Sequence, residues 1–454
     1  SSMCRRKTLL HYFGEEYTED NCCNCDNCRH PKPKVDARAS LVLALEALRA
    51  IGDKFKVDHL TNLLTGRLTA QIKSYGHNKL EWFGAGEEHD AKYWGAVMRQ
   101  ALILGLADKN IENYGLISIN AKGEDIQFEL KFEDDENDAE KSVNAYNKLK
   151  DWGMQILMGT VTTKPCIAVS TETSEDKIFQ LTPSASSTDV IGGQPDENGN
   201  VTIQRKDNVF QMCFTDPNQG VASAQYIKEQ NLGTKIAVIY NNGDAYSTGI
   251  YQKFESEAKK EGLEIVSVTT FPDDTNSDFS AQLNDAKAKG ADLLFLPIYY
   301  TPASLILTQA SKMNYTPKFF GVDGMDGILT VKNFDTKLAE NVMLLTPFTA
   351  DAADEKTQNS VKKYKEKFGD TPNQFAADTY DCIYALYEAC KAKGVKASDK
   401  VADICEALTA QFTDSSFKFD GLTGTGMTWK TTGEVSKSPK GMVIKNGAYE
   451  GMDK

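Results

Sequence analysis

The stretch Tyr114–Asp138, YGLISINAKGEDIQFELKFEDDEND, divides the chain into two parts that differ in composition and charge. All five histidines of the 454-residue chain precede this stretch. The residues before Gly123 include 17 basic and 15 acidic side chains, whereas those after it include 34 basic and 49 acidic ones. A single domain rarely separates its composition so sharply. We therefore expect two unrelated modules that meet in this stretch.

The length and composition are those of a soluble protein with roughly three domains. Hydrophobic residues make up 41% of the chain and charged residues 25%, which are ordinary values for globular proteins. No apolar run reaches the ~18 residues that a membrane-spanning helix needs, so we expect no membrane span. The first ten residues, SSMCRRKTLL, lack the apolar core of a signal peptide, so we find no export signal there and assign no compartment.

A cluster of cysteines near the N-terminus has the spacing of a zinc site. Cys22, Cys25 and Cys28 form a C-x2-C-x2-C run, and Cys4 lies 18 residues upstream of it. Four thiolates at such spacings suit tetrahedral Zn²⁺. Disulfides or a redox pair are the alternatives, but five cysteines leave one over and no βαβ pattern surrounds them. We expect a zinc-binding subdomain over residues 1–33, with Cys23 pointing away from the metal.

Residues 34–122 have the pattern of a small helical domain. Apolar spacing predicts helices at Ala39–Gly52, Val57–Gly66 and His89–Ala107, and glycine ends the first two. Two short extended pieces follow, joined by a turn at Glu112–Gly115. Three helices and a terminal hairpin indicate a winged helix, although the pattern alone also fits other small helical domains.

Two stretches of this first part carry a family resemblance. CRRKTLLHYFGE followed by CCNCDNC resembles the zinc-binding subdomain of RecQ-family DNA helicases, and SYGHNKLEWFGAGEEHDAKYW resembles their C-terminal winged helix, the RQC domain. The resemblance implies a structural zinc ion held by Cys4, Cys22, Cys25 and Cys28. It also implies that the winged helix grips duplex DNA.

Cationic side chains bind the DNA backbone without sequence preference, because they release counterions from phosphates. The candidate DNA contacts are Arg67, Lys73, Lys79 and Arg99, with Asn113 and Tyr114 at the tip of the hairpin. Ordinary solvated surface charges are the alternative for each basic residue. The helicase motor itself is not expected, because the chain contains no G-x-x-x-x-G-K-[ST] phosphate-binding motif, and we see no catalytic constellation elsewhere.

From Gly123 to the C-terminus, segments of strand and helix character alternate. The first predicted strand is DIQFELKFE, Asp125–Glu133, and later ones include KIAVIYNN and ADLLFLPIYY. Such alternation predicts parallel sheets with helices on both faces. More than ten strands exceed one comfortable open sheet, so we expect two lobes within a domain over residues 123–454.

Polar residues follow several of these strands, where ligands of open α/β sheets bind. The candidate ligand-binding residues are Thr162, Thr163, Ser184, Ala185, Ser186, Tyr246, Tyr299, Tyr300 and Asp323. Hydroxyls and free amides at a helix start can hold a carboxylate, and an acid can hold an ammonium group. That combination suits an α-amino acid. The alternative is that these residues only cap helices and form turns.

This second part resembles the periplasmic leucine/isoleucine/valine-binding proteins of ABC importers. The resemblance rests on EDDENDAEKSVNAYNKL, LMGTVTT, FQLTPSAS, TDPNQGVASAQYI, FFGVDGMDG and FAADTYDCIYALYEA, among others. It implies a two-lobed type I fold that binds a branched-chain or similar amino acid and delivers it to an ABC permease. It further implies that Thr163 binds the carboxylate beside Ser184 and Ser186, that Tyr246 and Tyr299 or Tyr300 line the pocket, and that Asp323 binds the amino group.

Two departures from that family accompany the resemblance. Asp323 stands where the family usually has glutamate. Family members also begin with a strand and a long helix before the strand that matches Asp125–Glu133, and winged-helix residues stand in that place here. We therefore expect a chimera-like fusion whose first lobe is incomplete.

The favoured function is amino-acid binding by hinge closure, without chemistry. The lobe crossovers are expected near residues 214–216 and 345–348, with a return near residue 420. We expect Thr163, Ser184 and Ser186 to be less ordered than Tyr246 and Asp323. The alternative function is that of a DNA-binding accessory region of a RecQ-type helicase, with the α/β part a fused or non-functional partner.

Overall fold

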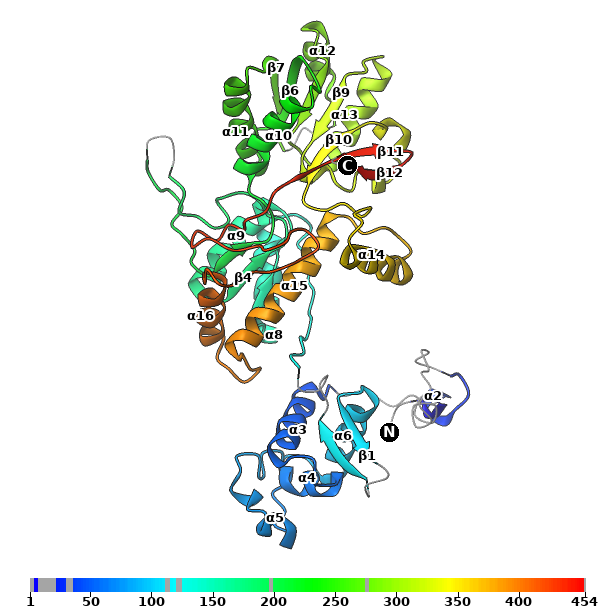
Figure 1. Cartoon of the computed structure of the whole chain (residues 1–454), viewed down its shortest axis with the longest axis vertical. Coiled ribbons are helices and arrows are strands. Elements are labelled where there is room, and N and C mark those ends of the chain that lie inside the picture. The colour runs from blue at the N-terminus through cyan, green and yellow to red at the C-terminus, as the bar shows by residue number, and fades with distance from the viewer. Residues whose placement is uncertain are drawn as a thin grey trace. The chain divides into compact units, whose positions relative to one another are not determined.

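The computed structural model describes residues 4–6, 22–29, 36–110, 115–119, 125–195, 199–273 and 277–452. The chain divides into two compact units, residues 1–129 and residues 130–454, which are described separately below (Figure 1). Within the described residues, every helix is too short or too polar to cross a lipid bilayer.

Unit 1 is a helical domain with a two-stranded wing. Its elements are α2 (Asp26–Arg29), α3 (Arg38–Ile51), α4 (Val57–Leu64), α5 (Ala70–Ser74), η1 (His77–Lys79), α6 (Ala91–Ile103), β1 (Ala107–Asn110) and β2 (Leu116–Ile119). The strands β1 and β2 pair antiparallel, with Ala107 opposite Ile119. Leu48, Leu60, Trp94 and Met98 are fully buried or nearly so between the helices. The three predicted helices and the hairpin are present, and the short α5 and η1 lie between the second and third helices.

Trp94 explains the glycine-rich stretch that precedes α6. Its indole Nε1 donates a hydrogen bond to the Gly86 carbonyl at 2.8 Å. A Cβ atom at Gly86 would lie only 2.2 Å from the Trp94 ring, so this position admits no side chain. The loop from Phe83 to His89 is therefore fixed on the helical core by one close backbone–aromatic contact.

Unit 2 contains two sheets, which define its two lobes. The sheet of the first lobe is parallel, in the order β3 (Ile156–Met158), β4 (Phe179–Thr182), β5 (Val209–Gln211). Around it lie α8 (Ala139–Trp152), α9 (Thr163–Asp176), α16 (Val401–Phe412) and much of α15 (Gln374–Lys393) (Figure 1).

The sheet of the second lobe has seven strands. Their order is β12 (Ala448–Gly451), β11 (Lys440–Lys445), β10 (Met343–Thr346), β9 (Lys318–Gly321), β8 (Leu293–Leu296), β6 (Lys235–Asn241), β7 (Glu264–Phe271). The accompanying helices are α10 (Asp216–Glu229), α11 (Ala245–Glu261), α12 (Ser280–Ala288), α13 (Tyr300–Lys312) and α14 (Glu355–Phe368), with the short turns η2 (Asp323–Met325), η3 (Ile328–Thr330) and η4 (Thr336–Ala339).

Strand burial follows from helices on both faces of this second sheet. Every residue of β8 and of β10 is buried, as continuous apolar runs in parallel sheets require. The sequence pattern predicts parallel strands, and β6 to β10 are parallel. At one edge of this sheet the strands are antiparallel instead. There β11 pairs with β10 and with β12, and a tight turn joins β11 to β12.

The prediction of a strand at Asp125–Glu133 is wrong. The structure assigns no strand to these residues, and Phe128, Leu130 and Phe132 are 37%, 55% and 74% exposed. Strict alternation of apolar and polar residues favours a strand, but a strand also needs a neighbour to accept its backbone hydrogen bonds. Among the described residues of unit 2, no strand lies beside β3 on the side away from β4.

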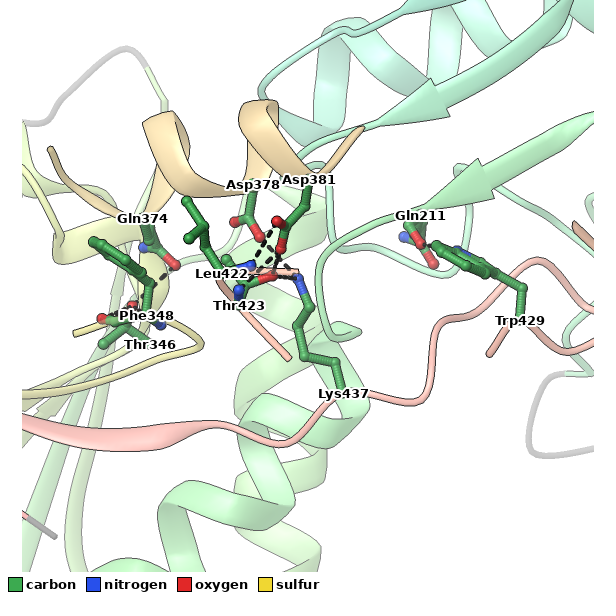
Figure 2. A network of polar contacts seen from close by, with 10 residues as sticks. All are labelled: Gln211, Thr346, Phe348, Gln374, Asp378, Asp381, Leu422, Thr423, Trp429 and Lys437. Atoms are coloured by element: carbon green, nitrogen blue, oxygen red, sulfur yellow. Dashed lines mark hydrogen bonds and ion pairs between the residues drawn. The ribbon is translucent and has the colours of Figure 1, made fainter. Parts of the chain in front are cut away.

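A buried polar network joins α15 of the first lobe to the segment that returns to the second lobe (Figure 2). Asp381 of α15 accepts hydrogen bonds from the backbone N–H groups of Leu422 and Thr423 at 2.7 and 2.9 Å. Lys437 donates to Asp378 at 2.8 Å and to the Thr423 hydroxyl at 2.5 Å. The returning segment that contains residues 422–437 is therefore fastened to α15 by charged groups that water does not reach.

Candidate functional site

The four cysteines predicted to bind zinc lie together. Their sulfur atoms, from Cys4, Cys22, Cys25 and Cys28, are all within 4.8 Å of one another. The backbone N–H of Arg5 donates to the Cys25 sulfur and that of Cys25 to the Cys22 sulfur, each at 3.4 Å. Such N–H···S contacts stabilise thiolates, and backbone donors lower the pKa of Cys22 to about 6. Four thiolates at this separation form a donor set that fits a tetrahedral metal ion.

Cys23 lies outside this set of four sulfurs. Its side chain is exposed, and its backbone adopts a φ of 55°, in the left-handed region. The turn through Cys23 and Asn24 thus directs Cys22 and Cys25 toward the cluster while Cys23 faces elsewhere. The Arg5 guanidinium forms an ion pair with Asp26 beside the cluster, at 2.5 Å.

The predicted DNA contacts of unit 1 are spread over several elements. Arg67 follows α4, Lys73 lies on α5, Lys79 ends η1 and Arg99 lies on α6, and all four side chains are exposed. Asn113 and Tyr114 lie outside the described residues. The accessibility of the four cations is compatible with phosphate binding.

In the second lobe, Asp323 is held in place by a dense set of hydrogen bonds. It begins η2 directly after β9, and it is only 4% exposed. The Tyr246 hydroxyl donates to its carboxylate at 2.6 Å, and the Gly324 N–H donates to the same hydroxyl at 2.9 Å. Tyr299 stacks on Tyr246 with ring centroids 4.6 Å apart. Burial raises the pKa of Asp323 to about 6, although the Tyr246 hydrogen bond opposes this shift.

Asp216 is a second buried acid that the sequence analysis did not select. It begins α10 just after the first lobe ends, and it is 1% exposed. Its backbone N–H donates to the Ser186 carbonyl at 2.9 Å. Within the described part of the chain, neither of its carboxylate oxygens has a hydrogen-bond partner. Burial raises the pKa of Asp216 well above its usual range.

Gln219 lies on α10, three residues after Asp216, and bonds to Asp323. Its Oε1 accepts a hydrogen bond from the Asp323 N–H at 3.3 Å, while its buried Nε2 has no partner among the described residues. The sequence does contain a signal for Asp216 and Gln219, because they follow the carboxyl end of β5, where ligands of α/β sheets bind. An Asp-Pro pair at the start of a helix, however, is equally typical of ordinary helix capping.

The first lobe contributes two buried hydroxyls that lack partners in the described structure, those of Thr163 and Ser186. Thr163 begins α9 after β3, and Ser186 follows β4. The other residues of the first lobe that were predicted to bind the ligand form hydrogen bonds within that lobe. The Ser184 hydroxyl donates to the Val161 carbonyl at 2.6 Å, the Thr162 hydroxyl donates to the Asn137 side chain at 2.6 Å, and the Ala185 N–H donates to Thr182 at 3.1 Å.

Thr163 and Tyr299 bring the two lobes together at this site. The backbone N–H of Thr163 lies close enough to the Tyr299 phenol to lower its pKa, although burial raises that pKa well above its usual value. Nearby, Lys164 of the first lobe forms an ion pair with Asp273 of the second at 3.2 Å. Tyr300, one residue further on, is 37% exposed and starts α13. Of the two candidate tyrosines, Tyr299 is therefore the one that lies with the other site residues.

The residues gathered here differ in charge between the two lobes. The start of α9 offers N–H groups and the Thr163 hydroxyl, which favour an anion. Asp216 and Asp323 offer two buried carboxylates, and no ion pair of either is found among the described residues. Burying a charge without a partner is costly, so such a pair of acids is suited to a cationic ligand group.

Sequence profiles of three families match the chain. The profile described as periplasmic binding protein matches residues 92–447, the RQC domain matches residues 31–139, and RecQ zinc-binding matches residues 1–29. The first two overlap over residues 92–139, the stretch in which the winged helix gives way to α8. The expected combination of families and the expected fold class are thus confirmed.

Individual relatives fall into the same two groups. The Leu/Ile/Val-binding protein homolog 3 of Brucella melitensis is 29% identical over 205 residues, which are 45% of this chain and 51% of that protein. The ATP-dependent DNA helicase RecQ of Pasteurella multocida is 31% identical over 114 residues, 25% of this chain and 18% of the helicase. The chain thus spans about half of the first relative and under a fifth of the second.

Solved structures show the same fold for unit 2. The substrate-binding protein LivJ of a branched-chain amino acid transporter from Streptococcus pneumoniae, in complex with isoleucine, superposes with a TM-score of 0.61 at 23% identity, over 71% of this chain and 87% of that one. The leucine-binding protein LivK of Thermotoga maritima gives 0.60 at 24% identity, over 70% and 85%. Because the periplasmic binding protein profile covers most of its length, the chain belongs to that family, and it carries the zinc-binding and RQC regions of RecQ proteins at its N-terminus.

Proposed function

We propose that unit 2 binds an α-amino acid with a branched aliphatic side chain, reversibly and without chemistry. The observation that carries the proposal is the set of unpartnered polar groups at the contact of the two lobes. Among the described residues, the Thr163 and Ser186 hydroxyls and the Asp216 carboxylate are buried without hydrogen-bond partners. Buried polar groups are normally satisfied, so groups left unsatisfied together point to a missing ligand.

The proposed roles follow from charge. The ligand carboxylate would face the Thr163 and Ser186 hydroxyls and the N–H groups at the start of α9. The ligand ammonium would face Asp216 and Asp323, which supply charge-assisted hydrogen bonds. The stacked rings of Tyr246 and Tyr299 would provide apolar surface for the ligand side chain. Ser184, Thr162 and Ala185 would position the loops through their local hydrogen bonds.

Lobe closure would couple ligand binding to a partner. A ligand held by Thr163 on one lobe and Asp323 on the other favours the conformation in which both touch it. A solved structure with this fold is named as the substrate-binding protein of a branched-chain amino acid transporter, and an ABC permease is the proposed partner of unit 2.

Isothermal titration calorimetry of the whole chain with L-leucine, L-isoleucine and L-valine tests the proposal. We expect saturable binding by at least one of them, and weaker or no binding of D-leucine, because the enantiomer cannot place three groups at once. L-Glutamate serves as a charged-side-chain control. Absence of heat with every aliphatic amino acid, from protein shown to be folded, would contradict the proposal.

For unit 1, we propose a zinc ion held by Cys4, Cys22, Cys25 and Cys28 as a structural support, because this small region has little core of its own. Metal analysis of the Cys25→Ser and Cys23→Ser proteins tests it. We expect about one zinc per chain in the parent and in Cys23→Ser, and loss of zinc in Cys25→Ser. Equal zinc loss in both variants would contradict the assignment.

The family match and the exposed cations support a second function, weak binding of duplex DNA by the winged helix. We propose Arg67, Lys73, Lys79 and Arg99 as phosphate contacts, with Asn113 and Tyr114 at the hairpin tip. Fluorescence anisotropy with two unrelated duplexes should give similar affinities that fall steeply with salt. Binding that is insensitive to salt, or equally strong after Arg67→Ala, Lys73→Ala and Lys79→Ala are combined, would contradict it.

A further inference from the structure

Gly324 lies beside the proposed ligand site, between Tyr246 of α11 and Tyr299, which directly precedes α13. It is the middle residue of η2, which follows β9, and it is buried. The φ angle of Gly324 lies outside the left-handed region, so its backbone conformation is one that other residues adopt readily. The conformation of the chain therefore does not require a glycine here, and the reason for it lies in its surroundings.

The surroundings of Gly324 leave no space for a side chain. A Cβ atom at this position would lie 2.5 Å from the Tyr246 hydroxyl oxygen, 3.1 Å from the ring carbon that bears it and 3.0 Å from the Tyr299 ring. These separations are well below the ~3.5–4.0 Å at which non-bonded carbon atoms pack favourably. Any residue other than glycine thus requires either the η2 backbone or the tyrosine rings to move.

The backbone of η2 is held on two sides by buried side chains. The Asp323 N–H donates to Gln219 of α10 at 3.3 Å, and the Asp323 carbonyl accepts a hydrogen bond from Gln374 of α15 at 2.5 Å. Both glutamines are at most 1% exposed, so water cannot readily replace these bonds. A shift of the backbone would leave buried polar groups without partners, which is costly.

The two tyrosines are therefore the groups that a side chain at position 324 would displace. Tyr246 is 2% exposed, and its ring stacks on that of Tyr299. The Tyr246 hydroxyl donates to the Asp323 carboxylate at 2.6 Å and accepts a hydrogen bond from the Gly324 N–H at 2.9 Å. A Cβ that pushed this hydroxyl away would disturb both bonds, and the carboxylate would no longer be oriented by the tyrosine.

We propose that Gly324 is a positioning residue of the ligand site, an inference that rests on the proposed function of unit 2. Because Gly324 has no Cβ, the Tyr246 hydroxyl can approach the η2 backbone, and from there it fixes the Asp323 carboxylate that receives the ligand ammonium group. Hydrogen bonds weaken steeply when their geometry is poor, so the orientation of this carboxylate affects affinity. Gly324 acts through Tyr246 and needs no contact with the ligand itself.

A double-mutant cycle with Tyr246→Phe tests this role, because phenylalanine lacks the oxygen atom that a Cβ at position 324 would strike. Calorimetry gives the L-leucine affinity of the whole chain for the parent, Gly324→Ala, Tyr246→Phe and the double variant. We expect Gly324→Ala to weaken binding about tenfold or more in the parent, since it disturbs a hydrogen bond to a charged group. In the Tyr246→Phe background the same change should cost about twofold or less, because residues that act through one contact are not additive.

Gly451→Ala of β12 is the matched control, because a Cβ at that position would meet nothing closer than 3.7 Å, and it should leave the affinity unchanged. Urea unfolding of the four proteins without ligand should show the same non-additive pattern in the free energy of unfolding.

The two readouts separate this inference from the proposed function. A parent protein that binds no leucine, while the unfolding free energies remain non-additive, would contradict the proposed function and leave the contact between Gly324 and Tyr246 supported. Equal losses of leucine affinity from Gly324→Ala in both backgrounds would overturn the role of Gly324. Failure of both Gly324→Ala proteins to fold would equally overturn it, since loss of the hydroxyl would then not have relieved the clash.

Discussion

The two lobes of unit 2 differ in how their sheets end. The second lobe has seven strands and finishes in the β11–β12 hairpin, whereas the first has three strands among the described residues, with β3 at one end of the sheet. The difference extends to the proposed ligand groups. Asp323 in the second lobe is fixed by Tyr246 and Gly324, while the Thr163 and Ser186 hydroxyls of the first lobe have no partners in the described structure. A site can thus be preformed on one side and depend on its ligand on the other.

The largest effect is expected where the lobes are fastened together. Lys437→Met should lower the free energy of unfolding by about 3–5 kcal/mol, because it leaves the buried carboxylate of Asp378 without its cation. Urea unfolding followed by circular dichroism measures this. Lys430→Met is the control, since Lys430 is exposed and pairs with Glu434 on the surface. Similar losses in both variants would show that the buried network does not hold the lobes together.

The next largest effect is expected when a proposed ligand contact is removed from one lobe or the other. Asp323→Asn and Asp216→Asn should each weaken L-leucine binding by about 1–3 kcal/mol, because each removes a charged partner of the ammonium group. Thr163→Val, in the less supported lobe, should cost less, about 1 kcal/mol. Calorimetry provides all three values.

Ser184→Ala is the control for that series, because the Ser184 hydroxyl is engaged with the Val161 carbonyl and is not proposed to touch the ligand. Its effect on affinity should be smaller than that of Thr163→Val. If Ser184→Ala weakened binding more than Asp216→Asn did, the proposed roles of the two lobes would be wrong.

A smaller effect is expected from pH. Burial raises the pKa of Asp323 from 3.8 to about 6, so the carboxylate must lose a proton before it pairs with an ammonium group at low pH. Affinity for L-leucine should therefore fall as the pH drops below 6, by up to about tenfold per pH unit for each proton released. Titrations in buffers of different ionisation enthalpy count these protons.

The unliganded protein should respond in the opposite direction. An acid whose pKa is raised in the folded state binds more protons when folded than when unfolded. The contribution of Asp323 to the free energy of unfolding therefore declines as the pH rises from about 4 to about 6. The contradicting result is one in which both the affinity for L-leucine and the free energy of unfolding rise with pH in the parent protein, while neither does so in Asp323→Asn.

The sequence predicted elements well where local pattern and tertiary setting agree. The helices of unit 1 and the buried strands of the second lobe carry apolar periods that match their final burial. The failure at Asp125–Glu133 is instructive, because alternation describes one strand and cannot report whether a neighbour exists. The chain supplies the alternating pattern of IQFELKF, but the structure assigns no strand to these residues.

The candidate ligand residues were predicted unevenly for a similar reason. Thr163, Ser186, Tyr246 and Asp323 lie where the strand ends indicated. The sequence analysis did not select Asp216, because an Asp-Pro at a helix start is an ordinary cap, and only its burial without a partner in the described structure distinguishes it. Ser184 and Thr162 were selected, yet they bond to nearby backbone and side chain. Burial and hydrogen-bond satisfaction are properties of the folded chain that spacing does not encode.

Hydrogen–deuterium exchange with and without L-leucine tests most directly whether both lobes share the site. The account predicts new protection at residues 160–165 and 184–187 of the first lobe, together with a smaller gain around Asp323, which is already fixed by its neighbours. Protection confined to the second lobe, or none at all at a leucine concentration that saturates the calorimetric signal, would contradict a binding site formed by both lobes.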